Sequence, residues 1–107
     1  QEKFPADLLC QMAEEAAAIR LCQVWLNEEE RCYELYLEPK EEEHRSESQL
    51  AAVMDAYLQE QFPPYGRYRQ YKVINPLKVH LLPDGRKEAL LESTAKIPLV
   101  LPAPLKN

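Results

Sequence analysis

The sequence predicts an α+β fold in which helix, hairpin, helix and hairpin follow one another (αββαββ), with an antiparallel sheet and both helices packed on one of its faces. Three observations predict it. Apolar residues recur at helical spacing in two segments, they alternate with polar residues in two others, and prolines or a Pro-Asp-Gly turn separate the segments. With 107 residues the chain has the usual size of one domain. We therefore expect residues 1–107 to form a single domain, with 98–107 as a proline-spaced C-terminal tail.

The first expected element is a helix from about residue 6 to about residue 19. Its apolar stripe consists of Leu8, Met12, Ala16 and Ile19. Pro5 suits a first turn, because the N–H that proline lacks has no partner there. Asp7 places a negative charge near the positive end of the helix dipole. Both signals favour a helix that begins near residue 6.

The second expected element is a β-hairpin. Between residues 20 and 37, a period of two places Leu21, Tyr33, Leu35 and Leu37 on one face. A turn centred near Asn27 would then place Cys22 opposite Cys32. The same register would place Arg20 opposite Glu34, which is a favourable pair of opposite charges.

The same stretch also fits a helix. Asn27 is a suitable helix cap, and Glu28–Glu30 would then stand at the positive end of the helix dipole. In that case the fold becomes a helical layer that carries one long C-terminal β-hairpin. We favour the hairpin for residues 20–37, because aromatic residues and cross-strand matches are many.

The third expected element is a helix with a defined start and a defined end. Ser46, followed three residues later by Gln49, fits a capping box. The apolar stripe that follows consists of Leu50, Val53, Tyr57, Leu58 and Phe62. Pro63 and Pro64 end the helix, because the residue before a proline is pushed out of the α region. The polar stretch before Ser46 is expected to be an exposed loop.

The last expected element is a long hairpin around Pro83, Asp84 and Gly85. Proline presets the first corner of such a turn, and glycine supplies the positive φ. Pairing outward from the turn puts Leu77, Val79, Leu81, Ala89 and Leu91 on one face. The opposite face receives Lys78, His80, Arg86 and Glu88. The alternation continues on both sides through Tyr71, Val73, Ala95 and Ile97. This length predicts a curved hairpin in a single register.

The net charge of −5 limits the classes of partner. Nucleic acids and anionic membranes need a positive surface to bind, so this composition disfavours both. No run in the sequence approaches the roughly 18 apolar residues of a membrane span. The chain starts at Gln1 without a methionine, and no short apolar run behind a basic start marks a signal peptide. We lean towards a cytoplasmic location, with an exported protein as the alternative.

Residues that carry catalysis are scarce. His44 and His80 are the only histidines, and we expect His80 to face solvent with Glu88 as its cross-strand neighbour. Gly66 and Gly85 are the only glycines, and no nucleotide-binding or nucleophile motif can be written in the chain. We therefore expect the chain not to be an enzyme and to hold no cofactor or metal.

The three cysteines have spacings that match neither a CxxC redox motif nor a zinc site. We expect Cys10, Cys22 and Cys32 to be buried, reduced thiols, since free cysteine behaves as a small apolar residue. The alternative is a disulfide between Cys22 and Cys32 in an exported domain.

In residues 65–72, YGRYRQYK, tyrosines alternate with basic residues. Proteins that bind single-stranded nucleic acids use such side chains, because bases stack on the aromatic rings and cations neutralise the phosphates. We expect core tyrosines with an exposed basic rim. Trp25 and the apolar residues of the tail are further candidates for contact with a partner. The candidate partner surface consists of Trp25, Tyr65, Arg67, Tyr68, Arg69, Leu99, Leu101 and Leu105.

These observations favour a non-catalytic protein-interaction or accessory domain, such as an adaptor, a chaperone-like domain or an assembly subunit. A protein partner is expected, and a homodimer formed through a strand edge or the tail is one form of it. One alternative is an exported or periplasmic accessory domain that binds a small ligand or an assembly component. A second alternative is contact with single-stranded nucleic acid through residues 65–72.

Overall fold

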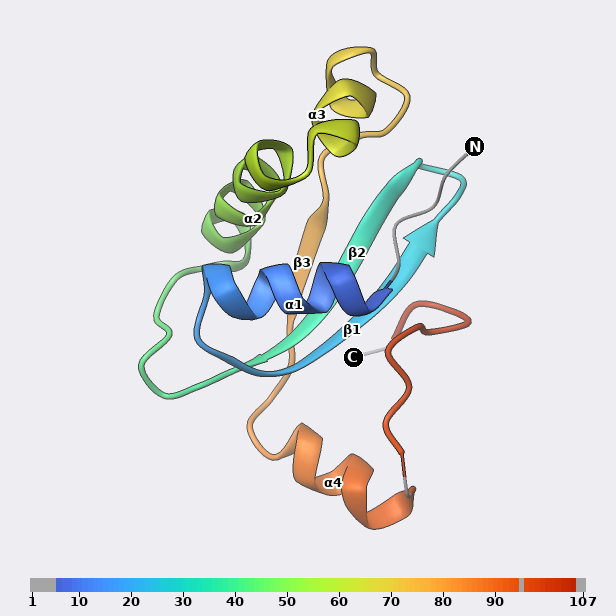
Figure 1. The fold of residues 1–107 in the computed structure, drawn as a ribbon. Helices are drawn as coiled ribbons and strands as arrows, with labels where there is room; N and C mark the ends of the chain where they lie inside the picture. The colour runs from blue at the N-terminus through green and yellow to red at the C-terminus, as the bar shows by residue number, and fades with distance from the viewer. Residues whose placement is uncertain (1–5, 95, 106–107) are drawn as a thin grey trace.

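The structure is a computed structural model that describes residues 6–94 and 96–105, and these form an α+β fold with four helices and a mixed three-stranded sheet (Figure 1). The elements are α1 (Ala6–Ala16), β1 (Ile19–Asn27), β2 (Cys32–Pro39), α2 (Glu47–Gln61), α3 (Pro63–Gln70), β3 (Lys78–Leu81) and α4 (Arg86–Ser93). The α+β class is confirmed. The predicted order αββαββ is replaced by αββααβα. Pro5 and Ala95, which entered the predictions for the first helix and the last hairpin, lie outside the described residues.

The first hairpin is confirmed, but its predicted register is wrong. β1 pairs antiparallel with β2, and Asn27 faces Cys32, so the four-residue turn 28–31 follows Asn27 instead of being centred on it. Arg31 adopts a left-handed backbone conformation with φ of 55° at the end of this turn. As a consequence Cys22 faces Leu37, not Cys32. In the same way Glu34 faces Trp25, and the predicted pairing of Arg20 with Glu34 does not form.

Helix α2 begins and ends where its local signals predict. The Ser46 side chain accepts from the Gln49 N–H, and the Gln49 side chain accepts from the Ser46 N–H, so both halves of the capping box are present. Phe62 ends the helix, and the two prolines then occupy the first turn of α3. Because proline is tolerated at that position, the chain re-enters a helix at once, and residues 65–70 are helical instead of leading into a strand.

The predicted C-terminal hairpin is wrong. Among the described residues of the predicted hairpin, Lys78–Leu81 alone form a strand, and residues 86–93 form α4. Gly85 has φ of 91°, as a turn glycine should, but here it is the N-cap of a helix. The Glu38 carboxylate accepts from the N–H groups of Gly85 and Lys87, at 3.0 and 2.7 Å. This interaction gives the exposed N–H groups of α4 a partner that lies far away in the sequence.

Strand β3 pairs with β2 in parallel. Leu35 faces Val79, and Leu37 faces Leu81, so the apolar face predicted for residues 77–81 does meet the core. The predicted continuation of that face beyond the turn fails, since Leu91 is 52% exposed. A parallel partner requires a long crossover connection, which residues 40–77 provide through α2 and α3.

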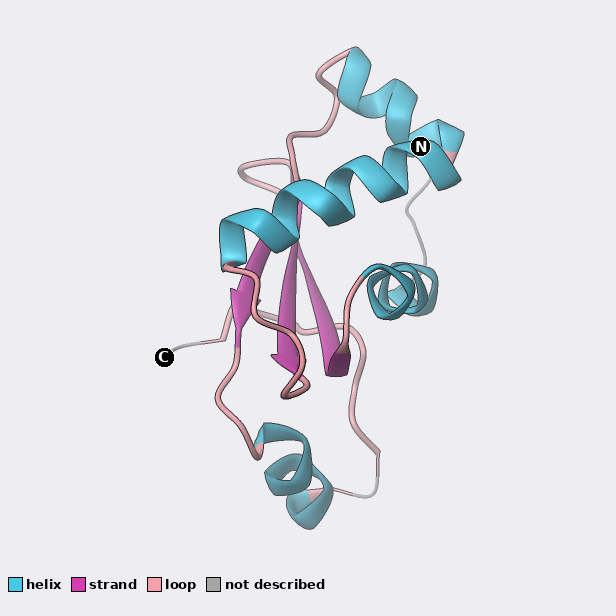
Figure 2. Ribbon diagram, turned by 90° about the vertical axis from the view of Figure 1, so that its left-hand side faces the viewer, coloured by secondary structure: helices cyan, strands magenta, loops and turns pink. Residues whose placement is uncertain are grey.

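The main core lies between one face of the sheet and the helices α1, α2 and α3 (Figure 2). Strand residues of this core are Ile19, Cys22, Val24, Tyr33, Leu35, Leu37 and Val79, and helix residues are Leu9, Cys10, Ala13, Leu50, Met54, Leu58 and Tyr65. Helix α4 stands apart from α1, α2 and α3, beyond the ends of the strands (Figures 1 and 2). No residue of this helix is buried.

The second face of the sheet carries a smaller core that the tail helps to build. Buried members are Leu21, Tyr36, Leu82 and Leu101, with Trp25, Leu90, Ile97 and Leu105 packed against them. The tail also pairs in parallel with β1 at one position. The Val24 N–H donates to the Leu99 carbonyl at 2.7 Å, and the Leu101 N–H donates to the Val24 carbonyl at 2.8 Å. The tail therefore folds back along the free edge of β1.

Candidate interaction surface

A row of hydrogen-bonded polar residues lies on the second face of the sheet, where it joins all three strands. Asn27 Nδ2 of β1 donates to Glu34 Oε2 of β2 at 2.8 Å. Glu34 Oε1 lies 2.7 Å from His80 Nε2 of β3. The His80 ring stacks on Tyr36, with ring centroids 4.6 Å apart. Strand alternation places these side chains on one face, so the row links the short β3 to the hairpin.

The electrostatics of this row favour an ionised Glu34. Burial raises the pKa of Glu34, but the hydrogen bonds from Asn27 and His80 outweigh burial and hold it below its ordinary value. The partner of His80 predicted from the sequence was Glu88, and this is wrong because residue 88 belongs to α4. Among the described residues, Glu34 is the only carboxylate that contacts the His80 imidazole. The pair therefore joins two strands, and it lacks the several converging acids of a catalytic or metal site.

Asp55 of α2 is a second polar centre, and it fixes the segment 65–72. Its carboxylate accepts from Tyr65 Oη at 2.5 Å and from Arg69 Nε at 3.0 and 3.1 Å. It also accepts from the Leu77 N–H at 3.3 Å, just before β3. Burial raises the pKa of Asp55, but the bonds from Arg69 and Tyr65 overcome this and lower it. Asp55 therefore connects α2, α3 and the start of β3.

This centre changes the interpretation of the basic and aromatic segment. Tyr65 is fully buried and Arg69 is paired with Asp55, so neither lies free on the surface for a partner. Tyr68 is half-buried and packs against the main core. Arg67 is exposed, and so is Tyr71, at 70%. The expected arrangement of core tyrosines with an exposed basic rim is therefore present in part of the segment. The tyrosines of residues 65–72 do not form one continuous exposed surface on which nucleic acid bases could stack.

The remaining candidates gather at a groove between β1 and the tail, which we call the Trp25–tail groove. It encloses about 370 Å³. Its lining consists of Ala6, Val24, Trp25, Leu26, Glu28, Tyr33, Val100, Leu101 and Pro102. Leu101 is buried and anchors the tail, while Leu99 and Val100 are 40% and 60% exposed. Leu105 is half-buried against the second core. The groove is thus lined mostly by apolar residues.

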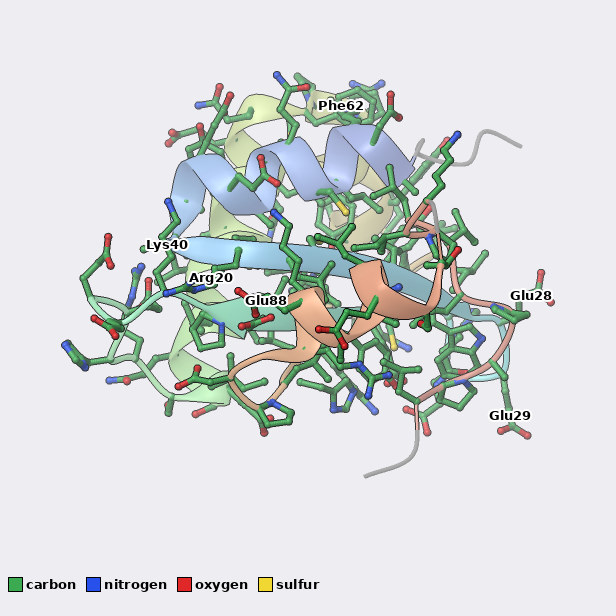
Figure 3. The ribbon with its side chains drawn as sticks, turned by 90° about the horizontal axis from the view of Figure 1, so that it is seen from below. Arg20, Glu28, Glu29, Lys40, Phe62 and Glu88 are labelled. Atoms are coloured by element: carbon green, nitrogen blue, oxygen red, sulfur yellow. The ribbon has the colours of Figure 1, made fainter. Side chains whose placement is uncertain are left out.

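A different groove, the cationic groove, lies where the hairpin begins and β2 ends. It encloses about 410 Å³ and is lined by Glu14, Ile19, Arg20, Lys40, Lys87, Glu88 and Leu91. Figure 3 shows Arg20, Lys40 and Glu88 together at this end of the molecule. The sequence did not point to this groove, because its cations come from three elements that are far apart in the chain.

The cysteines are buried free thiols, as predicted. The proposed disulfide between Cys22 and Cys32 is wrong, because the hairpin register separates them. Cys10 Sγ donates to the Cys22 carbonyl at 3.3 Å. The hydrogen bond with Cys10, together with burial, raises the pKa of Cys22, and burial raises that of Cys32. Raised thiol pKa values suit packing and oppose nucleophilic chemistry.

Within residues 6–94 and 96–105, no group of three or more His, Cys, Asp or Glu side chains is arranged to hold a metal ion. His44, the second histidine, lies exposed in the loop before α2. None of the helices in this part of the chain has the length and apolar character needed to cross a membrane.

A comparison with known protein families identifies the family of this domain. A model of the GH3 family C-terminal domain matches residues 9–97, which extend from α1 to just beyond α4. The chain belongs to the GH3 C-terminal domain family. A comparison with curated proteins found no match. The family description is of a domain, that is, of a part of GH3 proteins, and this agrees with the accessory domain predicted from the sequence. The tail beyond Ile97, which forms one wall of the Trp25–tail groove, lies outside the matched region.

Proposed function

We propose that this GH3 C-terminal domain is a non-catalytic accessory domain that associates with another region of a GH3 protein through the Trp25–tail groove. The apolar lining of this groove is the main observation in support. Its side chains are mostly apolar, and the tail presents Leu99 and Val100 partly exposed beside it. Exposed apolar residues that surround a groove are typical of surfaces that another protein covers.

The position of the first turn of α1 supports a partner within the same protein. Ala6, the first residue of α1, lines the Trp25–tail groove. A GH3 segment that precedes this domain would lead through residues 1–5 to Ala6, at the groove. Such a connection raises the effective concentration of the two surfaces, so even a weak contact would be occupied.

The polar centres support a scaffold role for the rest of the molecule. Asp55 connects two helices to β3, and Glu34 connects the three strands. Each carboxylate is held by neighbouring side chains of the domain itself. These groups therefore stabilise the sheet that positions Trp25 and the tail. The proposed binding of another GH3 region takes place at the Trp25–tail groove.

Nuclear magnetic resonance on the ¹⁵N-labelled chain tests this proposal. The separately produced preceding region of a GH3 protein is added unlabelled, and the amide and indole signals are followed. We expect the shifted signals to come from Trp25 and from residues 99–101, because the partner would cover them. Trp25 is the only tryptophan of the chain, so its indole signal is unambiguous.

A matched pair of variants completes the test. Val100→Glu places a charge beside the groove and should weaken binding at least about tenfold. Val73→Glu makes the same change at another exposed valine and should leave binding unchanged, since residue 73 does not line the groove. Absence of binding, equal effects of the two variants, or shifts confined to other surfaces would each refute the proposal.

A further inference from the structure

The cationic groove is lined by three cations and by two acids, Glu14 and Glu88, so the cations are in excess by one. Arg20 lies near the start of β1, Lys40 follows β2, and Lys87 lies in the first turn of α4. Among the described residues, none of the three makes an ion pair. In a chain with a net charge of −5, such a group attracts carboxylates from solution. Leu91, at the same groove, is half exposed and adds an apolar wall.

The opposite end of the hairpin carries an acidic protrusion, the tip. The turn 28–31 is exposed, and Figure 3 shows Glu28 and Glu29 pointing away from the rest of the molecule, far from Arg20 and Lys40. Glu30 is already paired with Lys78 at 2.6 Å. Glu29 has no ion pair among the described residues. The tip thus offers a carboxylate on a narrow turn.

We infer that the cationic groove of one copy binds the acidic tip of a second copy, with Glu29 facing Arg20 and Lys40. The tip suits this role because it protrudes. The other acidic run, 41–43, lies beside Lys40 at the end of the groove itself, and its Glu43 is held by Arg45. Charge complementarity between unlike surfaces sets the orientation of the two copies.

The geometry makes this contact head to tail. Groove and tip occupy opposite ends of the same hairpin, so a bound copy still presents one free groove and one free tip. A heterologous contact of this kind repeats and builds chains longer than a dimer, unless the rotation closes a ring. The inference does not depend on the proposed function, because it uses the cationic groove and not the Trp25–tail groove.

The net charge opposes association only at longer range. At about 0.1 M salt the Debye length is about 10 Å, so the repulsion between two acidic copies is largely screened beyond direct contact. Carboxylates and cations in contact are screened less. We therefore expect weak association at about 0.1 M salt that is lost at about 0.5 M salt.

Sedimentation equilibrium on the whole chain tests the inference. At about 0.1 M salt, we expect the average mass to rise with concentration from the monomer mass of 12.5 kDa and to pass that of a dimer. Glu29→Lys and Arg20→Glu should each weaken association at least about tenfold, because like charges then meet. An equimolar mixture of the two variants should restore it. The unaltered groove of Glu29→Lys still binds the unaltered tip of Arg20→Glu, and the two altered surfaces carry opposite charges. Lys40→Glu replaces Arg20→Glu if the latter changes the circular dichroism spectrum.

The control is Glu60→Lys, which makes the same change of charge on an exposed residue of α2. It should leave association unchanged. A constant monomer mass over the whole range of concentrations overturns the inference. So does an equal loss in Glu60→Lys, or a mixture of the two variants that stays monomeric. Val100→Glu should not alter the mass, which separates this test from that of the proposed function.

Discussion

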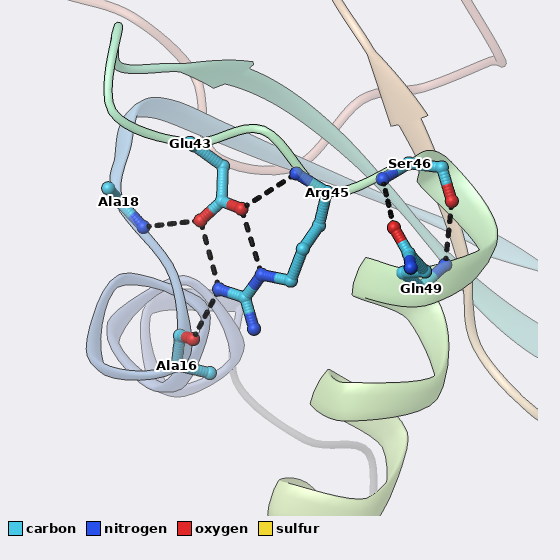
Figure 4. Close-up of polar contacts among 6 residues, drawn as sticks. All are labelled: Ala16, Ala18, Glu43, Arg45, Ser46 and Gln49. Carbon is cyan, nitrogen blue, oxygen red and sulfur yellow. Dashed lines mark hydrogen bonds and ion pairs between the residues drawn. The ribbon is translucent and has the colours of Figure 1, made fainter.

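Arg45 and Glu43 form a two-point ion pair that ties the loop after β2 to the end of α1 (Figure 4). Arg45 Nε lies 2.8 Å from Glu43 Oε2, and Arg45 Nη2 lies 2.9 Å from Glu43 Oε1. Nη2 also donates to the Ala16 carbonyl at 3.2 Å, and the Ala18 N–H donates to Glu43 Oε1 at 3.1 Å. The pair therefore gives the carbonyl of Ala16, the last residue of α1, and the N–H of Ala18, just before β1, their polar partners. It also precedes the capping box of α2.

Replacing Glu43 should give a pH-dependent loss of stability. The hydrogen bonds from Arg45 lower the pKa of Glu43 from its ordinary 4.5 to about 2. Its contribution is therefore present above pH 4.5 and lost as the pH falls towards 2. We expect Glu43→Gln to lower the free energy of unfolding by about 1–2 kcal/mol at pH 7, allowing for the part-exposed Arg45. Urea denaturation at pH 7 and pH 3 measures it.

At pH 3, the free energies of unfolding of Glu43→Gln and of the wild type should differ by less than at pH 7. The exposed neighbour Glu42 supplies the control, and Glu42→Gln should change stability little at either pH. An equal loss at both pH values would show that the charge of Glu43 is not what stabilises the loop.

Asp55→Asn should destabilise the whole fold by about 3 kcal/mol, because Arg69 would lose its buried counter-charge and one of the two acceptor oxygens would become a donor. Tyr65→Phe removes one hydrogen bond from the same centre and should cost about 1 kcal/mol. Guanidinium denaturation measures both values. If Asp55→Asn cost no more than Tyr65→Phe, Asp55 would not be the connection between α2, α3 and β3.

Glu38→Gln should loosen α4 selectively. The Glu38 carboxylate is 1% exposed and accepts from two N–H groups at the start of this helix. Losing the charge should cost about 1 kcal/mol, which corresponds to amide exchange about five times faster in residues 86–93. Hydrogen–deuterium exchange measures it. The control is Glu92→Gln, at an exposed residue in the last turn of the same helix, and uniform acceleration in all elements would contradict the prediction.

The thiols should react only after unfolding. Cys10, Cys22 and Cys32 are free and buried. Ellman's reagent should therefore modify none of them rapidly in the native chain and all three in guanidinium without reductant. A single reactive thiol after unfolding would reveal a disulfide, which the structure does not contain among the described cysteines.

Elements whose signals are local could be predicted. The start of α2 depends on Ser46 and Gln49, which are three residues apart, and both bonds of the box form. The first hairpin connects neighbouring strands. Its register was missed because the turn has four residues, with Arg31 in the left-handed conformation and no glycine to mark it. Strand alternation could place Asn27, Glu34 and His80 on the polar face only after that register was known.

Elements that depend on distant partners could not be predicted. Residues 86–93 alternate well enough for a strand, but Glu38 stabilises the start of a helix there. Tyr65 and Arg69 were predicted to belong to the candidate partner surface, but both contact the carboxylate of Asp55. The cationic groove has no sequence signature, because Arg20, Lys40 and Lys87 meet only when three elements pack.

The sequence by itself determined the α+β class and the capped helix, and it favoured the first hairpin over a helix and buried thiols over a disulfide. These follow from backbone hydrogen bonds and side-chain periodicity over a few residues. The tertiary structure decided the parallel place of β3, the helical state of residues 86–93 and the grouping of charges into grooves. Such choices depend on which distant segments bury apolar area and satisfy polar groups together, and short-range patterns do not contain that information.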